Sequence, residues 1–138
     1  MHEMKVIIRE AIRHRRPMVG QGNGLRREFC PHALGHTDGS WRVLTWQFAG
    51  LSETGLRDGG DWRCFSLEDL RNLTIRNGEW RRGVAVSADY IREHIAVVDT
   101  AVDPNHGPEI KGGFNWFGLA SRAAGAARRA SQGNPGKS

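Results

Sequence analysis

Hydrophobic residues near the start of the chain recur at a helical spacing. Five apolar residues follow an i, i+3, i+4, i+7, i+8 pattern, and they are Met4, Ile7, Ile8, Ala11 and Ile12. Pro17 ends this pattern, because proline disfavours helical geometry in the residue before it. The spacing predicts an amphipathic helix over residues 3–15.

Short alternating segments follow, and they are separated by residues that favour tight turns. The glycine-rich stretch GQGNG predicts a first hairpin, and the Asp-Gly pair in HTDGS predicts a second. Residues 25–34, with a bend at Pro31, are expected to form one strand. Residues 41–50 alternate over a longer stretch and are expected to form the longest strand.

The stretch WRCFSLEDLRNL, from Trp62 to Leu73, carries two periods in succession. Its first residues alternate as in a half-buried strand, and its leucines from Leu67 onward fall three apart, as in a helix. Ser66 stands at the junction, where its hydroxyl is expected to cap a short helix. Beyond it, IRNGEWRRG predicts another Asn-Gly hairpin, and the β-branched run within residues 93–103 predicts a closing strand.

One helix followed by short strands with Gly and Asp-Gly turns is typical of a small barrel-like sheet. No segment of helical length separates the middle strands, so the pattern does not fit alternating βαβ units. The expected fold is mainly β with an N-terminal helix, in one domain over residues 1–103. From residue 104 the composition shifts to Gly, Ala, Ser and Arg, which predicts a basic, flexible tail over residues 104–138.

Most of the net charge belongs to that tail. The 138-residue chain has 20 Lys and Arg and 15 Asp and Glu, a formal net charge of +5. Five of the basic residues and one acidic residue lie beyond residue 103, so residues 1–103 keep 15 basic and 14 acidic groups. We expect three tail arginines to attract nucleic acid non-specifically, and they are Arg122, Arg128 and Arg129.

Composition and motifs narrow the class of protein. Two cysteines are too few for a disulfide scaffold, and no apolar run is long enough to span a membrane. The N-terminal stretch lacks the features of a signal peptide, so we expect a cytoplasmic chain without membrane association. No Gly-x-Ser-x-Gly, phosphate-binding Gly-rich loop or His-Glu-x-x-His motif occurs, so we expect neither enzymatic activity nor a cofactor.

A zinc site is a minor alternative for the Cys and His residues of the strands. Cys30 and His32 would share a strand face, and His36 and Cys64 could complete a set of four ligands. However, the spacing Cys-x-His-x-x-x-His matches no standard ligand pattern. Buried cysteines and loop histidines are the favoured interpretation, and no metal is expected.

The order of these elements resembles the WYL-domain family of bacteria. The matching pieces are REFCPHALG from Arg27, GSWRVLTWQFAG from Gly39 and WRCFSLEDL from Trp62. Six further residues fit the small stand-alone members of that family, and they are Pro31, Gly35, Gln47, Gly50, Ser52 and Gly55. The resemblance covers about residues 4–76, roughly a single domain's worth.

The resemblance implies an Sm-like, SH3-type β-barrel that senses a ligand in regulation or defence, without being an enzyme. Several members of the family bind single-stranded nucleic acid. An arginine beside the aromatic residues of a sheet can hold a phosphate and stack on a base. The residues expected to bind single-stranded DNA, RNA or a nucleotide-type ligand are Arg27, Arg63, Trp41, Arg42 and Trp62.

Among the aromatic residues, Trp41 follows an Asp-Gly-Ser turn and is the better candidate for exposure. Trp46 and Phe48 are expected to pack in the core.

Other interpretations stay open for the predicted arginine site. Arg63 could instead lie on a solvated face or pair with Asp61 or Glu68. In addition, Asp69 stands where the WYL-domain family usually has an arginine. This difference favours a second function, in which the chain is a structural or oligomerising subunit that contacts a protein partner or a second copy and has lost ligand binding.

Overall fold

The computed structural model describes residues 1–104. The three tail arginines predicted to bind nucleic acid, Arg122, Arg128 and Arg129, lie outside the described residues. The chain divides into two units, and the first, residues 1–83 and 88–102, holds the helices and strands described below. The described part of the second unit, residues 84–87 and 103–104, contains no helix or strand.

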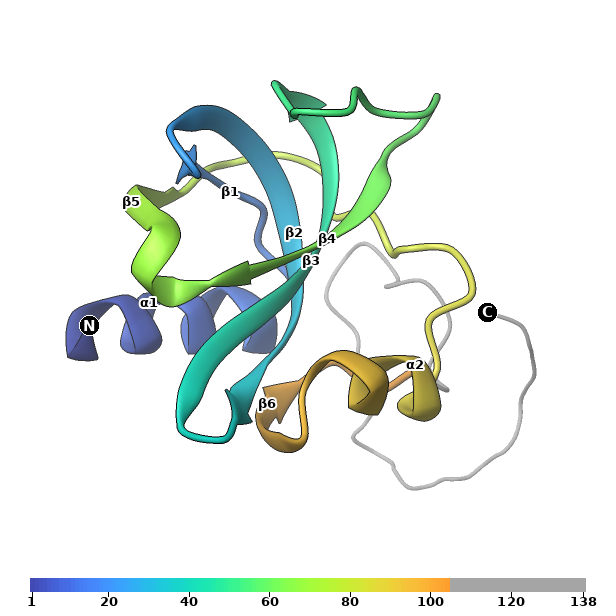
Figure 1. Ribbon diagram of the computed structural model, residues 1–138. Helices are drawn as coiled ribbons and strands as arrows, with labels where there is room; N and C mark the ends of the chain where they lie inside the picture. The colour runs from blue at the N-terminus through green and yellow to red at the C-terminus, as the bar shows by residue number, and fades with distance from the viewer. Residues whose placement is uncertain (105–138) are drawn as a thin grey trace. The chain divides into compact units, whose positions relative to one another are not determined.

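The first unit is mainly β with an N-terminal helix, as the hydrophobic pattern predicts (Figure 1). Its elements are α1 (His2–Arg13), β1 (Met18–Gly22), β2 (Leu25–Thr37), β3 (Ser40–Gly50), β4 (Asp61–Ser66), a 3-10 turn (Leu67–Asp69), β5 (Leu70–Ile75), α2 (Ala88–His94) and β6 (Val97–Ala101). Within the described residues, neither helix has the length and apolar character needed to cross a membrane.

The strands form one antiparallel sheet in the order β4-β3-β2-β1-β5. The first half of β2 pairs with β1 over residues 25–29, and its second half pairs with β6 over residues 33–36. β1 and β6 therefore share one edge of β2, while β3 occupies the other edge. Among the described residues β4 and β5 do not pair with each other, so the sheet is not closed.

Local turn chemistry explains the first two hairpins, and both predictions are confirmed. Asn23 and Gly24 have φ angles of 52° and 81°, and Asp38 and Gly39 have φ angles of 50° and 82°. Two successive residues with positive φ define a type I′ turn, which suits Asn-Gly and Asp-Gly pairs. These turns fix the register of β1 with β2 and of β2 with β3.

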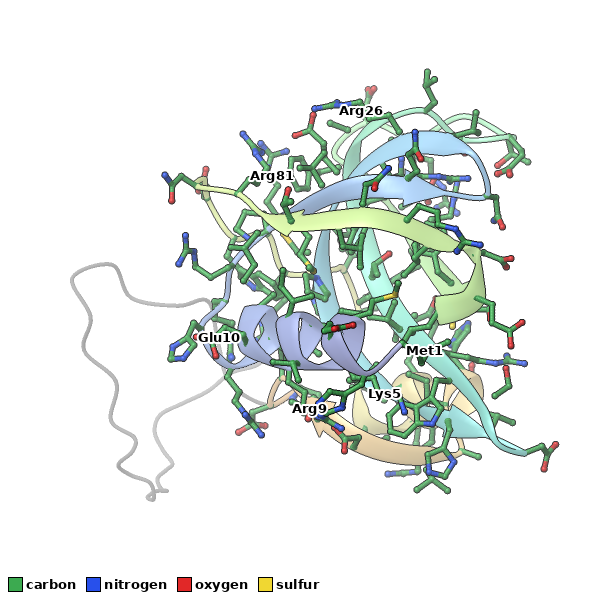
Figure 2. All side chains as sticks on the ribbon, turned by 90° about the vertical axis from the view of Figure 1, so that its left-hand side faces the viewer. Met1, Lys5, Arg9, Glu10, Arg26 and Arg81 are labelled. Carbon is green, nitrogen blue, oxygen red and sulfur yellow. The ribbon has the colours of Figure 1, made fainter. Side chains whose placement is uncertain are left out.

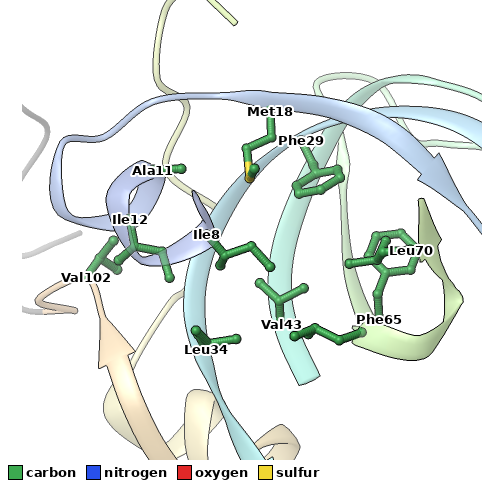
Figure 3. Close-up of a cluster of buried hydrophobic side chains, with 11 residues drawn as sticks. Ile8, Ala11, Ile12, Met18, Phe29, Leu34, Val43, Phe65, Leu70 and Val102 are labelled. Atoms are coloured by element: carbon green, nitrogen blue, oxygen red, sulfur yellow. The ribbon is translucent and has the colours of Figure 1, made fainter. Parts of the chain in front are cut away.

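The predicted apolar stripe of α1 packs against the sheet. Ile8, Ala11 and Ile12 are buried, and Met4 and Ile7 are half-buried against the same cluster. Figure 3 shows the buried side chains of α1 facing residues from the strands, which include Met18, Phe29, Leu34, Val43, Phe65 and Leu70. Burial of each large apolar side chain contributes about 1.5–3 kcal/mol, so this stripe holds the helix on the sheet.

Two predictions for the second half of the body are wrong, and a third is confirmed in part. The turn of helix expected after Ser66 is present as a 3-10 turn over Leu67–Asp69 with Ser66 at its N-cap position, but without the expected side-chain capping bond. Leu70–Ile75 is a strand, because it pairs with β1, and this pairing overrides the helical spacing of the leucines. Residues 76–83 contain no strand, so the Asn-Gly pair there does not form a hairpin. The strand expected within residues 93–103 is confirmed as β6, although it pairs with β2 and does not close the sheet, and α2 before it was not predicted.

Candidate functional site

Arg27 points from β2 into the interior, and its side chain is 1% exposed. Its Nε donates to the carbonyl of Gly22 at 2.9 Å, and one terminal nitrogen donates to Oε1 of Gln47 at 3.2 Å. The other terminal nitrogen donates to Oε1 of Glu53 at 3.1 Å. All three guanidinium nitrogens of this predicted ligand residue therefore have partners within the chain.

Arg63 extends from β4 to the loop of residues 51–60, which connects β3 to β4. One terminal nitrogen donates to the carbonyl of Trp62 at 2.8 Å. The other lies within hydrogen-bonding distance of three loop oxygens, namely Ser52 Oγ at 2.9 Å, Thr54 Oγ1 at 3.3 Å and the Gly55 carbonyl at 2.9 Å. Arg63 thus holds the first half of the 51–60 loop.

The two arginines selected by the resemblance both contact this loop, and both of their charges act on the Glu53 carboxyl. The backbone N–H of Glu53 and the Arg27 guanidinium hold the pKa of the Glu53 carboxyl below its ordinary value, and the charge of Arg63 adds to this effect. The alternative pairing of Arg63 with Asp61 is not found, because Asp61 pairs with Arg57 at 3.0 Å. No hydrogen bond or ion pair joins Arg63 to Glu68 either, within residues 1–104.

Trp62 lies on β4 among other aromatic rings. The ring centroids of Trp46, His32 and Tyr90 lie 5.3, 5.0 and 5.1 Å from its own. The backbone of Gly83 comes so close that a Cβ at that position would overlap the Trp62 ring. These contacts favour a packing role for Trp62 over the predicted role as a surface for base stacking.

Trp41 and Arg42 lie at the end of β3 that is far from the 51–60 loop, so the structure does not bring them together with Arg27 and Arg63. Trp41 is half-buried, and the Lys5 ammonium lies 3.8 Å from its ring centroid. The side chain of Arg42 forms no hydrogen bond or ion pair with the residues that the structure describes. Burial raises the pKa of the Cys64 thiol, and the positive charge of Arg42 partly offsets this rise.

His32 and Cys30 tie β2 to the segment after β5. His32 Nδ1 lies 2.8 Å from the carbonyl of Cys30, and Nε2 accepts from the Gly83 N–H at 3.0 Å. These partners require the neutral Nδ1–H form, and burial lowers the pKa of His32 to about 3. Cys30 Sγ accepts from the Arg81 N–H at 3.3 Å, and burial raises its pKa to about 11.

Three of the four residues considered as zinc ligands, Cys30, His32 and His36, have other side-chain contacts. Both ring nitrogens of His32 are bonded within the chain, and the ring of His36 lies 5.0 Å from that of Trp41. In the described part of the chain, no group of three or more His, Cys, Asp or Glu residues could hold a metal ion.

A cluster that the sequence did not predict surrounds Phe48 near the end of β3. Phe48 is half-buried, and the guanidinium carbons of Arg81 and Arg76 lie 4.5 and 5.9 Å from its ring centroid. Glu28 forms an ion pair with Arg76 at 3.0 Å, and it accepts a hydrogen bond from Arg26 at 2.8 Å. We call these five residues the Phe48 face. Figure 2 shows Arg26 and Arg81 in the upper part of the view, away from the labelled residues of α1.

The Phe48 face is positively charged and accessible. Arg26 and Arg76 have side chains that are 62% and 39% exposed, and Arg81 is also exposed. The face carries three guanidinium groups and one carboxylate, that of Glu28, which is 16% exposed and pairs with Arg26 and Arg76. Guanidinium groups bind phosphate oxygens, and both aromatic rings and guanidinium planes stack on nucleic-acid bases.

Part of this cluster could have been found from the sequence. Successive residues of a strand point to opposite faces, so the burial of Arg27 implies that Arg26 and Glu28 point outward. Arg76 and Arg81 have no such local signal. Their approach to Phe48 depends on the pairing of β5 with β1, which the spacing of the leucines concealed. Trp46 is buried as predicted, whereas Phe48 is only half-buried.

Comparison of the chain with protein-family models, with curated proteins and with solved structures found no match. The resemblance to the WYL-domain family therefore stays a prediction.

Proposed function

We propose that this chain is a non-enzymatic module that binds single-stranded nucleic acid through the Phe48 face. The observation that carries the proposal is the aromatic ring of Phe48 beneath two guanidinium groups. A third arginine, Arg26, is linked to Arg76 through the carboxylate of Glu28. Single-strand binding proteins combine these same two components, a positive groove for the backbone and aromatic side chains for the bases.

Glu28 orients the arginines without neutralising them. Each of its carboxylate oxygens pairs with one guanidinium, Oε2 with Arg26 and Oε1 with Arg76. A guanidinium has five N–H donors, so both groups keep donors for phosphate oxygens. A base could replace Arg81 over the Phe48 ring or stack on its guanidinium plane. Stacking contributes about 1–3 kcal/mol for each base.

We also propose that the sheet is an Sm-like, SH3-type barrel similar to that of the WYL-domain family. Three features support it. The 13-residue strand β2 pairs with β1 and β6 along one edge. A register shift between Pro31 and Ala33 interrupts its pairing with β3, as at a bend. The 3-10 turn leads β4 directly into β5.

Fluorescence anisotropy with short oligothymidylate and oligouridylate tests the proposed binding. We expect the full chain to bind both, with an affinity that falls as salt rises. Changing Arg26 and Arg81 together to alanine should weaken binding at least about tenfold and reduce the salt dependence, because two phosphate contacts are lost.

The matched control is the double variant Arg57→Ala/Arg92→Ala, which loses the same charge at two exposed positions outside the Phe48 face. Equal weakening in the two double variants would show that net charge alone drives binding. That outcome, or the absence of salt-dependent binding by the full chain, would overturn the proposal.

A second candidate function is that of an oligomerising subunit, and strand β6 favours it. Val97 and Val98 are 53% and 39% exposed, and within residues 1–104 β6 pairs with β2 alone. An unpaired strand edge with apolar side chains can pair with another chain. Light scattering after size exclusion should then show a dimer that Val97→Lys converts to a monomer. A monomeric wild-type chain would exclude this candidate.

A further inference from the structure

The contact between Arg27 and Glu53 joins a buried cation to an exposed anion. The Arg27 side chain is 1% exposed, whereas that of Glu53 is 58% exposed. We propose that Arg27 and Arg63 frame a binding site for a small oxyanion, a phosphate or a carboxylate, and that the carboxylate of Glu53 occupies this site as an internal competitor. The proposal uses none of the residues of the Phe48 face.

The guanidinium of Arg27 is held in place without Glu53. Its Nε and one terminal nitrogen are fixed by the Gly22 carbonyl and by Gln47 Oε1. Gln47 is itself buried, and its amide nitrogen donates to the carbonyls of Ala49 and Leu51 at 3.0 and 2.9 Å. One terminal nitrogen therefore remains as a preorganised donor that points toward the 51–60 loop, and it bonds to Glu53.

Arg63 and the loop hydroxyls supply the remaining polar groups. One nitrogen of Arg63 contacts Ser52 Oγ and Thr54 Oγ1 on either side of Glu53. Ser52 Oγ also accepts from the Thr54 N–H at 3.3 Å. The positive charges of Arg27 and Arg63 both act on the Glu53 carboxylate. An oxyanion at this position would meet the same two charges and two nearby hydroxyl groups.

Glu53 is suited to displacement because it is solvated. An ion pair with one exposed partner is worth little, since water competes for the carboxylate. The hydrogen bonds that hold Arg27, and those that Gln47 makes to the start of the loop, do not involve Glu53. An incoming oxyanion therefore has to replace one ion-pair contact, while the remaining contacts of the loop can persist.

Thermal unfolding in sodium phosphate, compared with sodium chloride at equal ionic strength, tests the site. Glu53→Ala removes the competitor. We expect phosphate to raise the melting temperature of this variant half-maximally at a concentration at least about tenfold lower than for wild type. The control Asp58→Ala removes an equal charge from the same loop and should respond as wild type does. Equal phosphate responses in Glu53→Ala and Asp58→Ala would overturn the proposal.

Three further measurements identify the chemical class of the oxyanion and separate a loss of binding from a loss of folding. Acetate and a nucleoside monophosphate replace phosphate in parallel titrations, so that free carboxylate, free phosphate and nucleotide are distinguished. In the double variant Glu53→Ala/Arg63→Ala the phosphate response should disappear, and its persistence would contradict the role of Arg63. Phosphorus NMR line broadening by folded Glu53→Ala gives a second measure of binding, and no broadening beyond that with Asp58→Ala would also overturn the proposal.

Discussion

His32 accepts a hydrogen bond from the backbone N–H of Gly83 at 3.0 Å, so that a ring in β2 holds a segment 51 residues further along the chain. The other ring nitrogen faces the carbonyl of Cys30. The ring also lies against Trp62 and Trp80, at centroid distances of 5.0 and 4.8 Å. This buried, neutral imidazole connects the sheet to residues 80–83.

The first prediction is that mild acid destabilises the protein through His32. Its pKa falls from an ordinary value of 6.5 to about 3 in the folded chain, so the unfolded chain binds a proton that the folded chain does not. The free energy of unfolding should therefore be constant above pH 6.5 and decrease by roughly 1.4 kcal/mol per pH unit below it. Urea denaturation between pH 7.5 and roughly 5, above the range of ordinary carboxylates, measures this slope.

Two results separate His32 from the other histidines. His32→Gln should flatten the slope, and His14→Gln is the control, because the His14 side chain is exposed at the C-cap of α1. Titration of the His32 ring signals near pH 6 in the NMR spectrum of the folded protein would contradict the prediction.

The second prediction concerns the close approach of Gly83 to Trp62. Gly83→Ala should destabilise the protein by about 1–3 kcal/mol, because its Cβ would overlap the indole ring. Chemical denaturation measures the loss. Trp62→Phe should make room, so the double variant should be less destabilised than the sum of the two single variants. Strict additivity would show that the ring is not the obstacle.

The third prediction is that Arg63 stabilises the 51–60 loop more than it stabilises the fold. Arg63→Ala should lower the free energy of unfolding by only about 1 kcal/mol, because the loop contacts are partly exposed. Limited proteolysis should nevertheless cleave the loop several times faster. Arg57→Ala, which changes an exposed arginine of the same loop, is the control and should leave the cleavage rate close to that of wild type.

The fourth prediction depends on the proposed nucleic-acid binding and concerns Glu28. Its carboxylate is the acidic group of the Phe48 face, so Glu28→Gln should increase affinity for oligothymidylate several-fold at low salt. The gain should shrink as salt screens the charge. Asp58→Asn changes the same charge in the 51–60 loop and should have a smaller effect. A loss of affinity in Glu28→Gln would instead mean that orienting Arg26 and Arg76 matters more than their net charge.

The sequence alone determined the elements whose causes are local. The apolar stripe from Met4 to Ile12 needs only the helical period, and it predicted α1 and its buried face. The pairs Asn23-Gly24 and Asp38-Gly39 need only their own positive φ angles, and they predicted two hairpins. The two hairpin signals, together with the alternating segments beside them, predicted that the domain is mainly β.

Tertiary structure decided the features in which distant segments compete for the same residues. The leucines at 67, 70 and 73 fit a helical spacing, yet residues 70–75 became a strand because β1 offered backbone hydrogen bonds. The resemblance selected Arg27 and Arg63 from the sequence, but only the folded chain showed that both reach the loop that contains Glu53. The Phe48 face likewise has no sequence pattern, since strand pairing and loop closure bring its members together from parts of the chain that lack a common period.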